Sequence, residues 1–146
     1  MKSEMVIQTL NRLLEGELMA LEFYRIHAEA IPEERIVEGV QEILPAEHAH
    51  AVALTTRINE LGGDPAKPGG EASRKGQEMG ESSRAQGTVA ILKLELEQEQ
   101  HAIIDYAEVI AGVDRDIITL EMLEEQLFDE MRHAKWLKQT LLDLQG

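Results

Sequence analysis

Residues 44–54 read Leu-Pro-Ala-Glu-His-Ala-His-Ala-Val-Ala-Leu, and residues 127–137 read Leu-Phe-Asp-Glu-Met-Arg-His-Ala-Lys-Trp-Leu. Each segment holds a glutamate and, three residues later, a histidine: Glu47 and His50, then Glu130 and His133. Residues three apart lie on one face of an α-helix, and the rest of that face is leucine or alanine in both segments. This repeat predicts two helices that each carry a Glu-x-x-His pair on their apolar face.

A second repeat places one glutamate on each of two further helical segments. The apolar residues that share a face with Glu17 are Leu10, Leu13, Leu14, Leu21 and Tyr24. Those that share a face with Glu99 are Leu92, Leu96, Ile103, Tyr106 and Ile110. The two tyrosines of the chain each lie seven residues after the glutamate. We interpret the chain as a duplicated helix pair with approximate two-fold symmetry.

Helical periodicity runs through most of the chain, and no alternating strand pattern occurs. The expected helices cover residues 3–31, 33–61, 83–111 and 116–145. Pro45 lies inside the second of these and predicts a kink, because proline removes one backbone hydrogen bond; two shorter helices are the alternative. The third is expected to begin at Ser83, whose spacing to Gln86 is typical of a capping box.

The segment 62–86, rich in glycine, proline, serine and charge, connects the second and third helices. A segment of about 25 residues can span up to ~80 Å, twice the ~40 Å of such a helix. It can therefore run the length of the bundle and make these two helices parallel. The alternative, a linker between two domains, fails because one helix pair cannot bury its own core. The sequence predicts an all-α fold, an antiparallel four-helix bundle with one long crossover, as a single domain over residues 1–146.

The glutamates on the apolar faces point to metal. Burying an ionised carboxylate costs several kcal/mol even after relaxation, and converging carboxylates raise one another's pKa. Divalent cations offset four such charges, and glutamate oxygens with imidazole nitrogens suit iron or manganese and tolerate zinc. One glutamate from each of two helices plus Glu-x-x-His from each of the other two is a di-iron carboxylate pattern. The predicted ligands are Glu17, Glu47, His50, Glu99, Glu130 and His133.

The ligand on the third helix has rivals in the stretch Leu94-Glu-Leu-Glu-Gln-Glu-Gln100. Glu95 shares its face with Gln98 and Ala102, which is too polar for a buried ligand. Glu97 shares its face with Leu94 and His101 but also with Glu108. Glu99 has the most apolar stripe and fits the repeat, so it is preferred, with Glu97 as the alternative.

The remaining candidates have more ordinary interpretations. Tyr24 and Tyr106 are expected to be core aromatics with a hydrogen-bonded hydroxyl, the alternative being contact with a metal-bound carboxylate or electron donation. His27 is interpreted as a core or interface histidine and His48 as a surface or subunit-contact residue. His101 could hold a third metal with Glu97.

Composition limits the classes of function. The formal net charge of −14 argues against nucleic-acid binding, which needs clustered basic residues. The absence of cysteine excludes disulfides, thiolate metal sites and thiol catalysis. No segment approaches ~18 apolar residues and the N-terminal stretch has no uninterrupted apolar region. We therefore expect a cytoplasmic protein that does not bind membranes.

With these residues in place, the chain resembles the ferritin-like superfamily, and most of all the bacterioferritins. The stretch Leu10-Asn-Arg-Leu-Leu-Glu-Gly-Glu17-Leu-Met-Ala20, with Tyr24 and His27-Ala28, is similar to their first helix. The stretch Asp129-Glu130-Met-Arg-His133-Ala-Lys-Trp136-Leu137 is similar to their fourth. The resemblance covers nearly the whole chain.

The resemblance implies a ferroxidase centre that binds two iron ions per chain, with manganese or zinc as possible substitutes. Glu47 and Glu130 would bridge the two ions and Glu17 and Glu99 would be terminal ligands. His50 and His133 would each supply one nitrogen. The resemblance also implies a homo-oligomer whose partners are Fe(II) and O2 or H2O2.

Three departures limit this transfer. The family's haem methionine, just after the first glutamate of the second helix, is replaced by His48, so haem is not carried over. The chain stops at Gly146, where longer relatives continue into a short helix that lines channels of a 24-subunit shell, so the shell is not carried over either. The third helix matches only through the spacing from Glu99 to Tyr106.

Three functions are consistent with the residues. The first is a ferroxidase-type di-iron oxidoreductase that also stores iron. The alternative is a di-metal redox enzyme without storage, such as a peroxidase, a manganese catalase-like enzyme or an oxygenase. The third is a bundle that binds zinc or a partner without redox chemistry.

Overall fold

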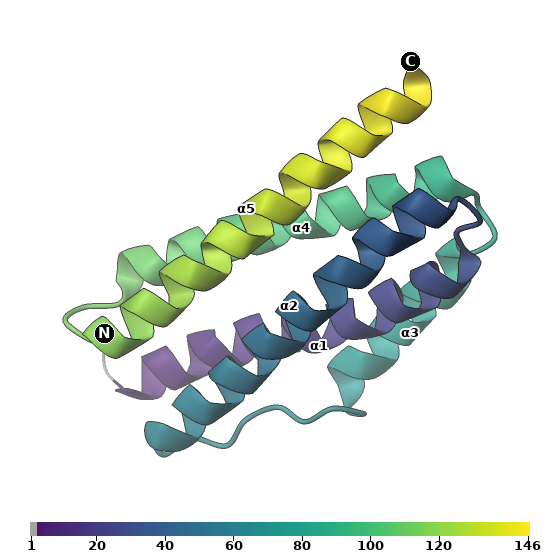
Figure 1. Ribbon diagram of the computed structural model, residues 1–146. Helices are drawn as coiled ribbons and strands as arrows, with labels where there is room; N and C mark the ends of the chain where they lie inside the picture. The colour runs from purple at the N-terminus through teal and green to yellow at the C-terminus, as the bar shows by residue number, and fades with distance from the viewer. Residues whose placement is uncertain (1–2) are drawn as a thin grey trace.

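The computed structural model describes residues 3–146, which fold into five α-helices without a strand (Figure 1). The helices are α1 (Ser3–Ala30), α2 (Glu34–Glu60), α3 (Glu71–Ser83), α4 (Thr88–Gly112) and α5 (Ile117–Gln145). The all-α helical bundle predicted from the sequence is confirmed. None of these helices is both long enough and apolar enough to cross a membrane.

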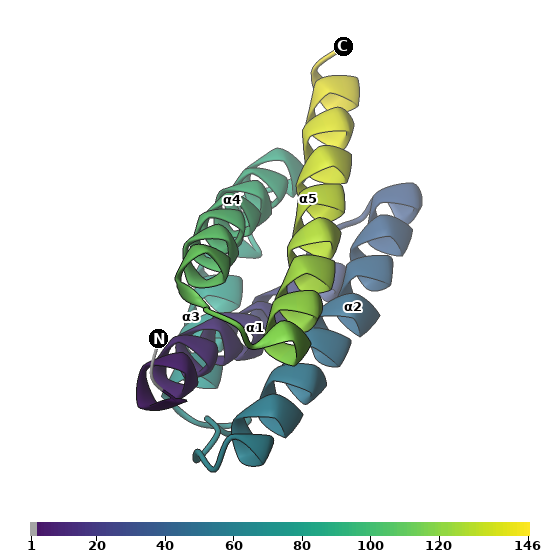
Figure 2. The same ribbon diagram turned by 90° about the vertical axis from the view of Figure 1, so that its left-hand side faces the viewer.

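The long helices form two antiparallel pairs, α1 with α2 and α4 with α5 (Figures 1 and 2). Helices α2 and α4 run in the same direction, because the segment between them travels back along the bundle (Figure 1). Contacts of α1 with α4 and of α2 with α5 join the two pairs. The predicted long crossover and the parallel arrangement of the two central helices are therefore confirmed.

The crossover contains a helix that the sequence interpretation missed. Helix α3 packs along α1 (Figures 1 and 2), and its buried residues are all small: Ser73, Gly76, Gly80 and Ser83. A Cβ atom at Gly76 would lie 2.2 Å from the Met19 carbonyl oxygen, so only glycine permits this approach. Leucine and isoleucine periodicity cannot reveal such a face, which is why the expected helices did not include this one.

The predicted start of the third long helix at Ser83 was also wrong. Ser83 ends α3, and its hydroxyl contacts the Met79 carbonyl oxygen at 2.7 Å. Gly87 precedes the first residue of α4 at φ 98°, a conformation that glycine adopts without strain. The Ser83–Gln86 capping box therefore does not form.

Helix α2 is continuous through Pro45, so the alternative of two shorter helices is wrong. It ends where expected, because Gly62 has φ 85° and the Gly62 and Gly63 N–H groups bond to the carbonyls of Asn59 and Ile58. This is the Schellman pattern, in which a glycine in the left-handed conformation stops the helix.

Two apolar clusters fill the bundle and leave its middle to polar residues. One cluster includes Leu10, Leu14, Leu54, Ile58, Tyr106 and Leu123. The other includes Phe23, Tyr24, Val40, Ile91, Leu92 and Leu137. On α2, α4 and α5 the predicted ligand glutamate lies between the residues of one cluster and those of the other, and on α1 Glu17 lies near the end of the first cluster, just before Leu18. The core therefore holds four glutamates at one level of the bundle.

Candidate metal centre

The four long helices each contribute to one buried cluster of carboxylates and imidazoles. Its members, none more than 8% exposed, are Glu17 on α1, Glu47 and His50 on α2, Glu99 on α4, and Glu130 and His133 on α5. The structure thus brings together all six residues that the sequence singled out.

The cluster consists of two groups of possible ligands that share Glu47 and Glu130. One group adds Glu17 and His50, and the other adds Glu99 and His133. Within each group the ligand atoms lie within 4.8 Å of one another. Each group could therefore hold a metal ion, and Glu47 and Glu130 belong to both.

Each histidine directs Nδ1 into the cluster, next to one outer glutamate. His50 Nδ1 lies 2.7 Å from Glu17 Oε2, and His133 Nδ1 lies 3.2 Å from Glu99 Oε2. The pairs are related as the sequence repeat predicts, α1 with α2 and α4 with α5. Each half of the cluster therefore has its own carboxylate and its own imidazole.

The two middle glutamates lie between the histidines. Glu130 Oε1 is 3.4 Å from His50 Nδ1 and 3.5 Å from His133 Nδ1. Glu47 Oε1 is 3.6 Å from His50 Nδ1 and 3.5 Å from His133 Nδ1. Glu47 Oε1 and both carboxylate oxygens of Glu130 are buried and accept no hydrogen bond from residues 3–146. Buried acceptors are normally satisfied, so these oxygens fit a shared cation.

Burial dominates the electrostatics of the carboxyls. It raises the pKa of Glu17 and of Glu99 to about 8. Burial and the neighbouring charges of the cluster raise the pKa of Glu47 well above its ordinary value. Burial alone would raise the pKa of Glu130 as well, but the two adjacent histidines outweigh it and hold that pKa at about 2.

Burial and the neighbouring carboxylates act in opposite directions on the pKa of each imidazole. Burial would lower the pKa of His50, yet Glu130 and Glu17 raise it to about 11. Burial would likewise lower the pKa of His133, and Glu130 and Glu99 raise it to about 9. Near neutral pH the metal-free cluster therefore stores protons that a divalent cation has to displace.

One neighbour of the cluster escaped the sequence interpretation. Asp129 Oδ2 accepts a hydrogen bond from His50 Nε2 at 2.8 Å, on the side of the ring away from the other carboxylates. Its position directly before Glu130 could have drawn attention to Asp129. A carboxylate that contacts a histidine of the cluster has no characteristic sequence spacing of its own.

The structure separates the rival glutamates of α4. Glu97 is exposed and lies outside both groups. Glu95 is fully buried, contrary to the expectation that its face is too polar, and its Oε2 lies 2.7 Å from His27 Nδ1. Only Glu99 reaches the cluster, as preferred from the repeat.

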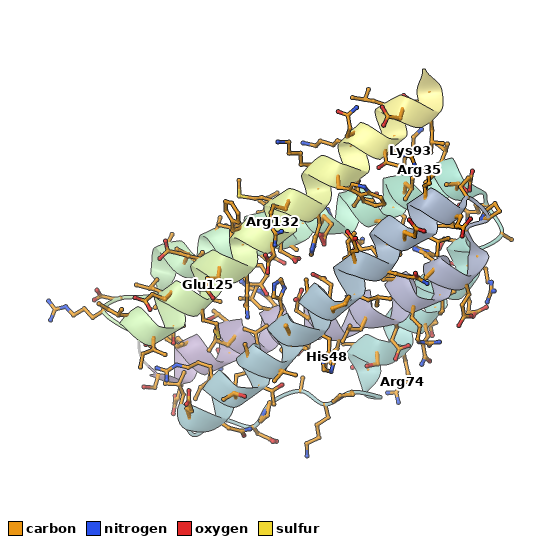
Figure 3. The ribbon with its side chains drawn as sticks, viewed as in Figure 1. Arg35, His48, Arg74, Lys93, Glu125 and Arg132 are labelled. Atoms are coloured by element: carbon orange, nitrogen blue, oxygen red, sulfur yellow. The ribbon has the colours of Figure 1, made fainter. Side chains whose placement is uncertain are left out.

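The other singled-out residues lie apart from the ligand groups. Tyr24 and Tyr106 are core residues as expected, but their hydroxyls have no hydrogen-bond partner within residues 3–146. His27 is a core histidine, as interpreted. His48, which Figure 3 labels on α2, is exposed. His101 is exposed and belongs to no cluster of three or more possible ligands in the part of the chain that is described.

A cavity of about 160 Å³ leads from the surface to the cluster between α1 and α4. Exposed residues line its outer part, among them Arg12, Gly16 and His101. Its inner wall includes Glu47 and Glu130. The cavity gives a small solute a path to the unsatisfied carboxylate oxygens.

Comparisons with known proteins relate this chain to one family. Residues 7–146 match the family model of the ferritin-like domain. A bacterial ferritin of Pseudomonas aeruginosa is 32% identical over 144 residues, covering 93% of this chain and 86% of the relative. A bacterial ferritin of Neisseria meningitidis is 29% identical over 147 residues, covering 95% of this chain and 88% of the relative.

A solved structure has the same fold. It is described as a dodecameric thioferritin, the bacterioferritin-related protein from Bacteroides fragilis. The TM-score is 0.84 at 24% identity, with 99% of this chain and 88% of that chain covered. At this identity the likeness concerns the fold alone.

Proposed function

The chain belongs to the ferritin-like domain family, and from this premise we propose that it is a ferroxidase that also stores iron. Fe(II) is its substrate and Fe(III) its product, with O2 or H2O2 as oxidant. Two Fe(II) ions give up two electrons, which with two protons reduce O2 to H2O2 or H2O2 to water. The observation that carries the proposal is the pair of ligand groups sharing Glu47 and Glu130.

We assign the ligands by position in the cluster. Glu47 and Glu130, each near both histidines, are the bridging carboxylates. Glu17 and His50 complete one site and Glu99 and His133 the other. Carboxylates and imidazoles suit iron, manganese and zinc, and two divalent ions offset the charge of four ionised glutamates. The expected content is therefore two metal ions per chain.

The residues contribute position, charge and protons. The two apolar clusters on either side hold these six residues at one level of the bundle, so their positions are set before metal arrives. The carboxyls of Glu17 and Glu99 and the two imidazoles release protons as cations bind, because their pKa values lie above neutral. The metal ions supply the redox chemistry when bound.

Storage requires a closed assembly of many chains. The named relatives are bacterial ferritins, and the structural neighbour is described as dodecameric. These relatives support a homo-oligomer, and we extend that expectation to this chain, together with a cytoplasmic location. Haem is not part of the proposal, because His48 replaces the family's methionine and lies on an exposed face.

The test is addition of Fe(II) in air to protein stripped of metal, with absorbance and particle size followed together. Wild type is expected to form an Fe(III) absorption band rapidly and to keep the iron in a particle of many subunits. Glu130→Ala should abolish the rapid phase, while Glu97→Gln, on the exposed side of α4, should leave it unchanged.

Three results test separate parts of the proposal. Scattering by a monomer or dimer alone would exclude storage while leaving oxidation intact. Rapid peroxide turnover with little iron retained would replace storage by a di-metal peroxidase or catalase-like activity. Unchanged oxidation by Glu130→Ala would contradict the metal centre itself.

A further inference from the structure

The two histidines of the cluster differ on the side that faces away from it. His50 Nε2 donates to Asp129 Oδ2 at 2.8 Å. His133 Nε2 has no hydrogen-bond partner within residues 3–146, and its side chain is 10% exposed against 4% for His50. One imidazole is therefore fixed at both nitrogens and the other only at Nδ1.

The difference follows from a break in the sequence repeat. Asp129 directly precedes Glu130 on α5 and reaches His50 on α2. Under the approximate two-fold symmetry, the residue directly before Glu47 on α2 should reach His133 on α5. That residue is Ala46, which has no acceptor to offer. The repeat therefore duplicates the predicted ligands, but it does not duplicate the aspartate that hydrogen-bonds the histidine.

Asp129 is itself held in place. The Arg132 guanidinium bonds its Oδ1, leaving Oδ2 for His50. Arg132 lies on the same stretch of α5, where Figure 3 labels it. Charged contacts therefore lead from Arg132 through Asp129 to Nε2 of His50, and the other nitrogen of that ring, Nδ1, faces the cluster.

A carboxylate on the second nitrogen of a metal-binding imidazole fixes the tautomer and the ring orientation and makes the ligand more basic. Removing such a partner lowers metal affinity by about 10- to 100-fold. We propose that Asp129 is a positioning residue that makes the Glu17–His50 half of the centre the tighter of two divalent-cation sites, so that this half fills first. The inference rests on the proposed metal centre but not on iron oxidation.

The test is calorimetric titration of the metal-free protein with Co(II), combined with its visible absorption spectrum. Wild type should show two binding phases whose dissociation constants differ by about tenfold or more. The spectrum after the first equivalent should match that of Glu99→Gln, which retains the Glu17–His50 half. Cobalt binding requires no oxidant, so the absence of ferroxidase activity would leave this result unaffected.

The variants identify the cause. Asp129→Ala should weaken the first phase by about 10- to 100-fold and leave the second unchanged. Asp129→Asn, which keeps a neutral acceptor, should lie between Asp129→Ala and wild type. Ala46→Asp should tighten the second phase, and this gain carries the test if Asp129→Ala does not fold.

Two outcomes would overturn the inference. One is a wild-type titration with two equal sites. The other is an Asp129→Ala variant, folded by circular dichroism, in which both phases keep their affinity or weaken to the same extent. Failure of wild type to bind Co(II) at all would instead remove the proposed metal centre.

Discussion

His27 on α1 and Glu95 on α4 form a hydrogen bond inside the bundle, with 2.7 Å between Nδ1 and Oε2 and no solvent exposure of either side chain. The other ring nitrogen, Nε2, lies 2.7 Å from the Ser83 hydroxyl at the end of α3. That hydroxyl also lies 2.7 Å from the Met79 carbonyl oxygen, to which it donates. The arrangement links three helices and leaves Ser83 with no free proton for chemistry.

Removing one member of this pair should destabilise the protein strongly. Glu95→Ala leaves His27 Nδ1 buried without its hydrogen-bond partner, and a buried polar group left unsatisfied costs about 1–3 kcal/mol. The measurement is the free energy of unfolding from urea titrations monitored by circular dichroism. Lys75→Ala is the control, because the Lys75–Glu71 pair is exposed and 3.8 Å long, and it should change little. Equal stability of Glu95→Ala and wild type would contradict a structural role for the pair.

The convergence of the six cluster residues was predictable because the spacing of each residue along its helix sets the face on which it lies. A glutamate surrounded at helical spacing by leucine and isoleucine must face the core, and the repeat of Glu47–His50 as Glu130–His133 doubles the signal. The choice of Glu99 over Glu97 depended on the same reasoning, and the structure agrees. Periodicity within one helix therefore finds an inward-facing glutamate where the neighbours on its face are apolar.

Contacts between distant segments were not predictable in this way. Glu95 shares its face with Gln98 and Ala102, so that face was judged too polar for a buried ligand, and its partner His27 lies 68 residues away. Helix α3, which contributes Ser83 to the arrangement, packs through glycine and serine, which give no hydrophobic periodicity. The His27–Glu95 contact and the packing of α3 depend on which helices lie next to each other, and the periodicity of a single sequence does not predict this.

Glu99→Gln tests the ligand of α4. It should abolish tight binding at the His133 half while the His50 half still takes one Co(II), because Glu17, Glu47 and Glu130 remain. The readout is the number of tightly bound ions per chain by calorimetry. Glu97→Gln, two residues away and exposed, should bind as wild type does. If the effects of the two variants were exchanged, the assignment on α4 would be wrong.

Metal binding should weaken as the pH falls. The pKa values of Glu17 and Glu99 are raised to about 8 in the metal-free cluster, so below pH 8 these carboxyls are mostly protonated and a cation has to displace the protons. The Co(II) dissociation constant should therefore increase from pH 8 to pH 6, and binding should release protons into weakly buffered solution.

The Glu99→Gln variant is the control for this pH dependence, because one of the two titrating carboxyls is gone. Because Glu99 no longer contributes a proton, saturating this variant with Co(II) should release fewer protons per chain than saturating wild type. A wild-type dissociation constant that is the same at pH 6 and pH 8 would show that the metal-free cluster does not hold these protons.

The cavity between α1 and α4 should control access to the cluster, and Gly16 is the place to close it. Gly16 lines the cavity, and a Cβ atom added there would meet nothing within 4 Å. Gly16→Leu should therefore place a side chain in the opening without displacing a ligand. We expect the initial rate of Fe(II) oxidation to fall by about tenfold, equivalent to about 1.4 kcal/mol on the barrier.

Gly16→Ala separates blockage from the change in helix propensity. Alanine stabilises a helix interior by about 0.5–1 kcal/mol relative to glycine, as leucine also does in large part, but its methyl group leaves most of the opening free. Gly16→Ala should oxidise Fe(II) at the wild-type rate, and both variants should keep the wild-type Co(II) affinity at equilibrium. If Gly16→Leu slows oxidation only in proportion to weaker Co(II) binding, the substitution has distorted the cluster. If Gly16→Leu oxidises Fe(II) as fast as wild type, substrate reaches Glu47 and Glu130 by a different path.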